Sequence, residues 1–122
     1  GPYILYTIVR IKSILNKYQA AGNDISNGQI GVPANASEKA LMLEAGKFNS
    51  VMENAFEEMA PHKICSYIYD LANAFNRFYH ETKILAEEDA DRKKSYIALL
   101  VLTKKVLEAC IGLLGFEAPE RM

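Results

Sequence analysis

The sequence has few of the residues that cross-link a protein or hold a cofactor. Among its 122 residues are two cysteines, two histidines and no tryptophan. Two scattered thiols are too few for the disulfide framework of a small secreted protein. Because Cys65 and Cys110 each lie in an apolar stretch, we predict that both are reduced core residues of a cytoplasmic protein.

Long hydrophobic runs are also missing. No apolar stretch approaches the roughly 18 residues that a membrane span needs, and no segment has the order of a signal peptide. We therefore expect a soluble, cytoplasmic protein without a membrane partner. The chain opens with Gly1 and Pro2 and lacks an initiator methionine, which predicts a tag remnant at residues 1–2 followed by a single domain over residues 3–122.

Neither sign of charge is in large excess. The chain has 14 lysines and arginines against 15 aspartates and glutamates, a net charge of -1. This balance argues against a domain that grips duplex nucleic acid by its backbone, but it leaves RNA binding open. The charge is nevertheless uneven, because residues 1–18 hold Arg10, Lys12 and Lys17 and no acid. One basic face is possible, although such unevenness also arises without any partner.

Hydrophobic residues make up 50% of the chain, and their spacing is helical. Residues 3–18 form the first predicted helix, and the glycine-rich segment 19–37 is predicted to be a flexible loop. We expect Ser37 to cap a second helix that includes Phe48, Asn49 to cap a third, short helix, and Pro61 to open a fourth over residues 61–82.

The last predicted helix follows the acidic connection 87–91, whose carboxylates suit a helix start, and Gly115 is expected to stop it. No β-strand pattern competes with these helices. The sequence thus predicts an all-α bundle of about five helices with one long flexible loop.

No group of residues has the pattern of a catalytic or metal site. His62 and Cys65 are too few for a metal, and the acids of 87–91 lack the spacing of a calcium loop. No nucleophile has a suitable base, and the glycines do not form a phosphate loop. We therefore predict a chain without catalytic residues, metal or cofactor.

The first predicted helix carries a second face beside its apolar stripe. Tyr3, Tyr6 and Arg10 follow one another at steps of three and four residues. Aromatic rings stack on unpaired bases, and arginine adds charge and planar stacking, so this face suits single-stranded RNA. Packing in a core or an interface is the alternative. A polar face of the helix 61–82, with Asn73, Arg77 and Glu81 as possible pairs, is expected to be solvated.

Three stretches together resemble the arginyl-tRNA synthetase family. They are Tyr3-x-x-Tyr-x-x-x-Arg-Ile11, the segment from Ser66-Tyr-Ile-Tyr-Asp-Leu-Ala72 to Phe75-Asn-Arg-Phe-Tyr79, and Leu113-Leu-Gly-Phe-Glu-Ala-Pro-Glu-Arg-Met122. The resemblance runs from Tyr3 to Met122. It implies a carboxyl-terminal anticodon-binding domain of the DALR type, a helical bundle that recognises the anticodon loop of arginine tRNA.

The same resemblance implies which residues contact the tRNA. Tyr3, Tyr6 and Arg10 match first-helix contacts, Tyr79 matches an aromatic residue of a later helix, and Met122 matches a terminus packed nearby. Ligation, with ATP and magnesium, would belong to an upstream catalytic domain of the same protein, which is a further expected partner. The alternatives are a non-catalytic helical protein-interaction module and, more remotely, a small metal-dependent or hydrolytic enzyme.

Overall fold

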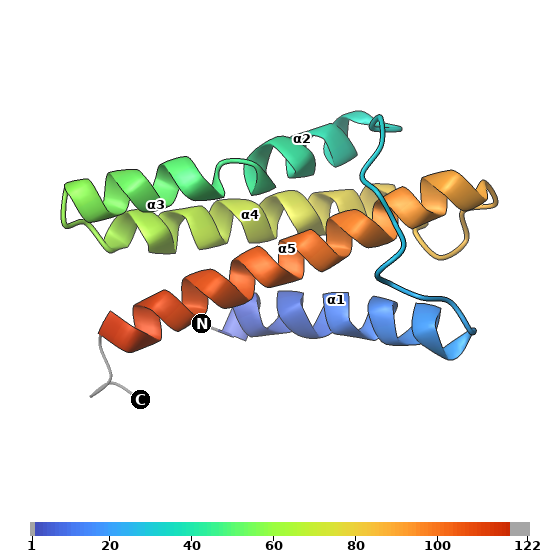
Figure 1. Ribbon diagram of the computed structural model, residues 1–122, viewed down its shortest axis with the longest axis horizontal. Helices are drawn as coiled ribbons and strands as arrows, with labels where there is room; N and C mark the ends of the chain where they lie inside the picture. The colour runs from blue at the N-terminus through green and yellow to red at the C-terminus, as the bar shows by residue number, and fades with distance from the viewer. Residues whose placement is uncertain (1, 118–122) are drawn as a thin grey trace.

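Five α-helices surround one hydrophobic core in the part of the chain that this computed structural model describes, residues 2–117 with the side chains of residues 2–115 (Figure 1). The helices are α1 (Pro2–Ala20), α2 (Ala36–Ala45), α3 (Phe48–Glu57), α4 (His62–Glu81) and α5 (Ala90–Glu117). Residues 2–117 contain no β-strand. The predicted all-α bundle of about five helices is confirmed.

Helix α4 lies at the centre of the bundle. Figure 1 shows α2 and α3 one after the other along one side of α4, α1 along another side, and α5 crossing the bundle. The apolar stripe of α4 buries Leu71, Phe75 and Phe78 completely, and they meet Ile11 of α1 and Leu100 of α5 in the same core cluster. Each such side chain contributes about 1.5–3 kcal/mol by leaving water. This burial holds α1 and α4 together.

The start of α2 differs from the prediction. Asn35, and not Ser37, is the N-cap: its extended backbone precedes the helix, and its Oδ1 accepts hydrogen bonds from the backbone N–H of Glu38 and the hydroxyl of Ser37, both at 2.8 Å. Asparagine and serine cap helices about equally well, so the local pattern did not separate them. The helix takes the earlier residue, which leaves Ser37 and Glu38 buried.

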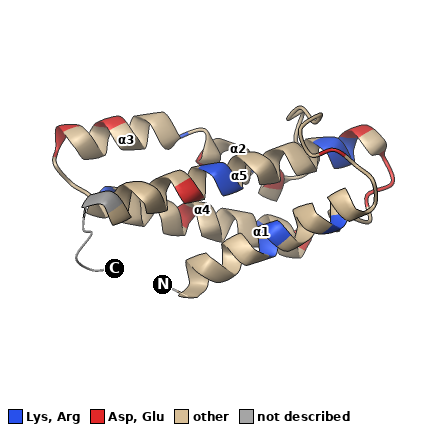
Figure 2. Cartoon of the chain, turned by 60° about the horizontal axis from the view of Figure 1, so that its bottom comes forward, with Lys and Arg blue, Asp and Glu red and all other residues tan. Residues whose placement is uncertain are grey.

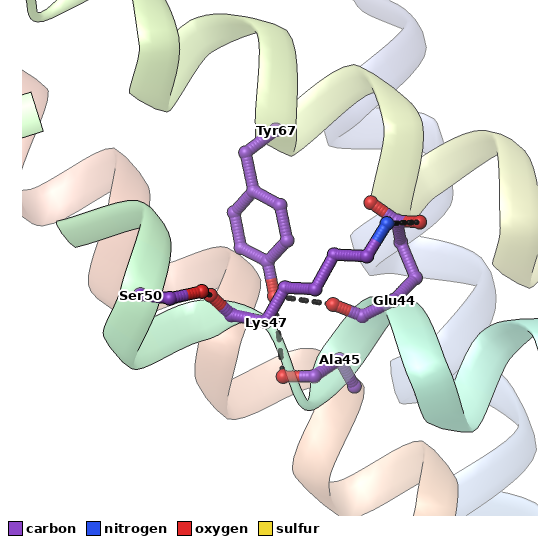
Figure 3. A network of polar contacts seen from close by, with 5 residues as sticks. All are labelled: Glu44, Ala45, Lys47, Ser50 and Tyr67. Carbon is purple, nitrogen blue, oxygen red and sulfur yellow. Dashed lines mark hydrogen bonds and ion pairs between the residues drawn. The ribbon is translucent and has the colours of Figure 1, made fainter. Parts of the chain in front are cut away.

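The break between α2 and α3 also lies earlier than predicted. Phe48 begins α3 and does not belong to α2, and Lys47 occupies the N-cap without a side-chain hydrogen bond, so the prediction of Asn49 as a cap is wrong. Tyr67 of α4 stabilises this junction. Its hydroxyl donates to the carbonyl oxygens of Glu44 at 2.8 Å and Ala45 at 3.2 Å (Figure 3). Burial raises the pKa of the Tyr67 hydroxyl, which stays a donor.

The predicted loop is present between α1 and α2, and it is bound to the bundle. Gly22, at a φ of +94°, takes the backbone conformation that lets the chain leave α1. Gly28 lies so close to α5 that a Cβ there would be 2.5 Å from the carbonyl oxygen of Lys94. The N–H of Gly31 donates to the Ser95 hydroxyl at 2.8 Å. These contacts fix the loop on the first turns of α5.

Helix α5 begins at Ala90, inside the predicted connection 87–91, and ends later than predicted. The Asp89 carboxylate accepts a hydrogen bond from the N–H of Arg92 at 3.0 Å, so an acid of the connection does serve the helix start. The prediction that Gly115 stops the helix is wrong, because α5 continues to Glu117. A glycine inside a helix costs only about 1 kcal/mol relative to alanine, which does not break a helix packed over most of its length.

The two cysteines are free, and they lie in different environments. Cys110 is buried in the core, and this burial raises the pKa of its thiol to about 11. Cys65 is exposed, so its assignment to the core was wrong. It lies on α4 next to the buried Ile64, just outside the apolar stripe.

Over residues 2–117, none of the helices combines the length and the apolar character needed to cross a membrane.

Candidate nucleic-acid interface

The second face of α1 packs along α4 at residues that the sequence singled out. The core stripe of α1 buries Ile4, Ile8 and Ile11, which turns Tyr3 and Arg10 toward the edge of the contact with α4. Both side chains bind residues more than sixty positions away in the sequence. The helix pair therefore determines how these two side chains are presented.

Arg10 is held between two side chains of α4. Its Nη1 donates to Oδ1 of Asn76 at 2.7 Å, and its guanidinium carbon lies 4.1 Å from the centre of the Tyr79 ring. A cation over an aromatic face is stabilised by the quadrupole of the ring. The half-buried Tyr79 ring in turn packs against Phe75, so Arg10 rests on a rigid support.

Tyr3 is held in the same way through its hydroxyl. The hydroxyl donates to Oδ1 of Asn73 at 2.7 Å and accepts from Nδ2 of Asn76 at 3.0 Å. The ring lies nearly parallel to that of Tyr69, at 10° and with 6.2 Å between the centroids. Tyr3 is 39% exposed and Tyr69 is 44% exposed, so the pair presents aromatic surface to solvent.

Tyr6 lies outside these contacts. It is 71% exposed, and within residues 2–117 its side chain forms no hydrogen bond. Leu5 and Val9 beside it on α1 are also exposed, at 61% and 60%. The structure thus brings Tyr3, Arg10 and Tyr79 together through α4, while Tyr6 projects separately from α1. Met122, the fifth predicted site residue, lies outside the described residues.

The helix α1, which carries much of this face, is positively charged. The charged residues of helix α1 are all basic, whereas α3 and the turn after it carry Glu53, Glu57 and Glu58 (Figure 2). Lys17 lies beside Tyr79 on this face. Lys12 faces α5 instead and forms one long ion pair, at 3.9 Å, with Glu108. Both partners are about half exposed, so this pair contributes little and leaves α1 a positive surface.

The sequence prediction missed much of the α4 side of this face. Tyr69, Asn73 and Asn76 follow each other at steps of four and three, the spacing that had identified Tyr3, Tyr6 and Arg10 on α1. Asn73 belonged to the polar face expected to be solvated, and it is exposed, but it bonds Tyr3 and not Arg77. The predicted pair of Arg77 and Glu81 is confirmed, at 3.3 Å.

The described residues offer no alternative built around a metal. Among the side chains of residues 2–115, no group of three or more histidines, cysteines, aspartates or glutamates is placed to hold an ion. The acids of 87–91 are used locally: Glu87 accepts from the N–H of Asp89, and Asp89 accepts from the N–H of Arg92.

Known proteins similar to this chain are arginine–tRNA ligases. The chain is 67% identical to the enzyme of Agathobacter rectalis, 54% identical to that of Alkaliphilus oremlandii and 43% identical to that of Maricaulis maris. Each match covers the whole chain but only 20–21% of the relative, so the chain spans about a fifth of the length of these ligases.

A family model extends over nearly all of the chain. It matches residues 4–122 and describes a DALR anticodon binding domain. The resemblance expected from the three sequence stretches is therefore confirmed, and the chain belongs to the DALR anticodon-binding domain family.

Proposed function

We propose that residues 3–122 act as one tRNA-recognition domain of an arginine–tRNA ligase and bind the anticodon loop of arginine tRNA. The observation that carries this proposal is the connected face of α1 and α4, where Tyr3, Arg10 and Tyr79 are held together beside the exposed Tyr6. These four residues are the proposed contacts, with Met122 added from the family resemblance.

The chemistry of this face suits unpaired bases better than a duplex. The exposed rings of Tyr3, Tyr6 and Tyr69 provide surfaces on which bases stack, and each stacked base contributes about 1–3 kcal/mol. Arg10 uses one N–H on Asn76, and its other donors and its charge remain for a phosphate or a base edge. A loop of RNA offers both partners at once.

The chemical step would lie elsewhere in the ligase. The catalytic part of the enzyme, upstream of this segment, would bind ATP and magnesium, and this domain would position the tRNA for it. We assign no catalytic residue to the present chain. Such a protein would work in the cytoplasm, where aminoacylation supplies translation.

Replacing Tyr6 by alanine tests the proposal directly. Loss of one stacking surface should weaken binding of a fluorescently labelled arginine anticodon stem-loop by about tenfold or more. Fluorescence anisotropy with the 122-residue chain at low salt measures this change. Because Tyr6 is exposed and makes no hydrogen bond within residues 2–117, the thermal stability should stay unchanged.

Phe56 provides a matched control, because it is an aromatic residue of similar exposure, 57%, on the acidic helix α3. Phe56→Ala should leave binding unchanged. The proposal is wrong if the wild-type chain binds an unrelated anticodon stem-loop as tightly as the arginine one.

Leu5 and Val9 support a second candidate function, a protein contact on α1. Two exposed aliphatic residues four positions apart form a small apolar ridge on the helix surface. The partner would be the catalytic part of the same ligase. Sedimentation of the isolated chain tests whether this ridge binds protein. Self-association that Leu5→Gln abolishes and that the stem-loop does not affect would favour the protein contact over RNA.

A further inference from the structure

One amide on α4 connects the two helices at the proposed RNA-binding face. Nδ2 of Asn76 lies within hydrogen-bond distance of three acceptors, the hydroxyls of Tyr3 and Thr7 at 3.0 and 2.9 Å and the carbonyl of Ala72 in its own helix at 3.0 Å. Its two hydrogens are shared among these three acceptors. Its Oδ1 accepts from Arg10 at 2.7 Å. Both ends of this half-buried side chain are therefore occupied.

The partners fix the orientation of this amide. A guanidinium has only donors, so Arg10 must face the oxygen. A carbonyl has only acceptors, so Ala72 must face the nitrogen. The hydroxyls of Tyr3 and Thr7 accept from the amide and donate onward, to Asn73 Oδ1 and to the Tyr3 carbonyl respectively. Each donor therefore faces an acceptor, with the two amide hydrogens of Asn76 shared among three acceptors.

The amide holds Arg10 without cancelling its charge. An aspartate of almost the same shape would bind the guanidinium more strongly, but it would neutralise the cation and lose the donor to Tyr3. Among the side chains of residues 2–115, no carboxylate lies within ion-pair distance of Arg10. The guanidinium is thus ordered over Tyr79 while its positive charge stays available.

We propose that Asn76 is the positioning residue of the RNA-binding face. It orders Tyr3 and Arg10 before RNA arrives, and it leaves the positive charge of Arg10 without a neutralising partner. This inference rests on the proposed tRNA-recognition function. Ordering long side chains in advance reduces the entropy lost on binding, so Asn76 contributes to affinity without needing to contact the RNA.

A pair of nearly isosteric substitutions tests the role of Asn76. Asn76→Asp places a carboxylate on Arg10 and removes the donor to Tyr3, whereas Asn73→Asp adds the same charge one turn away and keeps the acceptor for Tyr3. Asn76→Asp should weaken binding of the labelled arginine stem-loop by about tenfold or more. Asn73→Asp should weaken it by a few-fold at most.

Salt dependence separates positioning from a loss of structure. Neutralising Arg10 should lower the slope of log affinity against log salt concentration by about 0.7, the value for one contact with single-stranded nucleic acid. Asn76→Ser, which releases Arg10 without adding charge, should weaken binding but keep the wild-type slope. In an Arg10→Ala background, Asn76→Asp should no longer change the slope beyond the effect of Asn73→Asp.

The outcomes distinguish this inference from the function on which it rests. If the wild-type chain prefers the arginine stem-loop but Asn76→Asp and Asn73→Asp bind it equally, Asn76 has no positioning role and the proposed function stands. If Asn76→Asp fails to fold, the affinity of Asn76→Ser for the arginine stem-loop is the deciding measurement. An affinity equal to that of the wild type would overturn the inference. If the wild-type chain shows no preference for the arginine stem-loop, both proposals fail.

Discussion

Met59 adopts a backbone conformation that usually belongs to glycine. Its φ is +50°, and it ends α3 in a Schellman motif, in which the N–H of Ala60 donates to the Ala55 carbonyl at 2.8 Å and the N–H of Met59 donates to the Phe56 carbonyl at 3.3 Å. The side chain is 88% exposed and so gains little from burial. A side chain in this conformation costs about 1–2 kcal/mol.

Met59→Gly should therefore stabilise the protein. The gain expected is up to about 1 kcal/mol, because the greater freedom of glycine in the unfolded chain offsets part of the relieved strain. Urea unfolding followed by circular dichroism measures it. Met59→Ala keeps the Cβ and should stay within about 0.5 kcal/mol of the wild type. Equal stability of the two variants would show that the backbone at this position carries no strain.

Glu38 is a buried carboxylate with one oxygen unsatisfied. Its side chain is 1% exposed, Oε1 accepts from the N–H of Ala34 at 2.6 Å, and Oε2 has no partner among the described residues. Burial raises the pKa of this carboxyl above its usual 4.5, and the Ala34 hydrogen bond and the charge of Arg92 only partly oppose it. The folded protein therefore holds this proton more tightly than the unfolded chain does.

This raised pKa gives the pH dependence a definite sign. Folding takes up a proton between the unfolded and folded pKa values of Glu38, so its contribution to stability is complete below pH 4.5 and declines as the pH rises through the folded pKa. Glu38→Gln should remove this decline, which urea unfolding at a series of pH values detects. Glu53→Gln, at an exposed position, should keep it. The assignment would be contradicted if the free energy of unfolding of the wild type, minus that of Glu38→Gln, rose with pH over the same range.

At the scale of an element, α2 depends on a side chain from another helix. The Tyr67 hydroxyl of α4 donates to the carbonyls of Glu44 and Ala45 at the end of α2 (Figure 3). No side chain from the α2–α3 junction donates to these two carbonyls. Tyr67→Phe should destabilise the protein by about 1–2 kcal/mol, because a buried carbonyl loses its donor.

Thermal unfolding compared with Tyr18→Phe measures this contribution. The Tyr18 ring is equally well buried, at 6% exposure, but within residues 2–117 its hydroxyl has no hydrogen bond, so its removal should cost less than about 0.5 kcal/mol. Equal destabilisation by the two substitutions would mean that ring packing, and not the hydroxyl, supports the junction.

The same junction shows what the sequence could and could not predict. The apolar stripes of α1, α4 and α5 were evident because helical periodicity is a local property. The ends of α2 were misplaced because Tyr67 acts from a distance and because Asn35 and Ser37 are equivalent caps. At the proposed site, the α1 residues were predicted from spacing and resemblance. Asn76 was missed, because its contacts with Tyr3 and Arg10 form only where α1 packs against α4.

For the molecule as a whole, the uneven distribution of charge matters more than its sum. The net charge is -1, yet α1 has no acidic residue and α3 has no basic one (Figure 2). A chain of this kind does not attract nucleic acid over its entire surface. Binding should be restricted to the α1 side, and its salt dependence should be modest, with a slope of about 2 or less for the few cations there.

Charge reversal on opposite sides of α4 tests this restriction. Lys17→Glu on α1 and Lys39→Glu on α2 change the net charge identically, and both lysines are exposed. Lys17 lies beside Tyr79, on the side of α1 that carries Tyr3 and Arg10. Figure 1 shows α1 and α2 separated by α4, so an RNA on the α1 side should respond only to Lys17. We expect Lys17→Glu to weaken stem-loop binding several-fold and to lower the salt slope by about 0.7 or more, while Lys39→Glu leaves both close to wild type. Equal effects would mean that the RNA responds to net charge alone. In that case the proposed binding face would have no electrostatic role, and any specificity would have to come from stacking on Tyr3 and Tyr6.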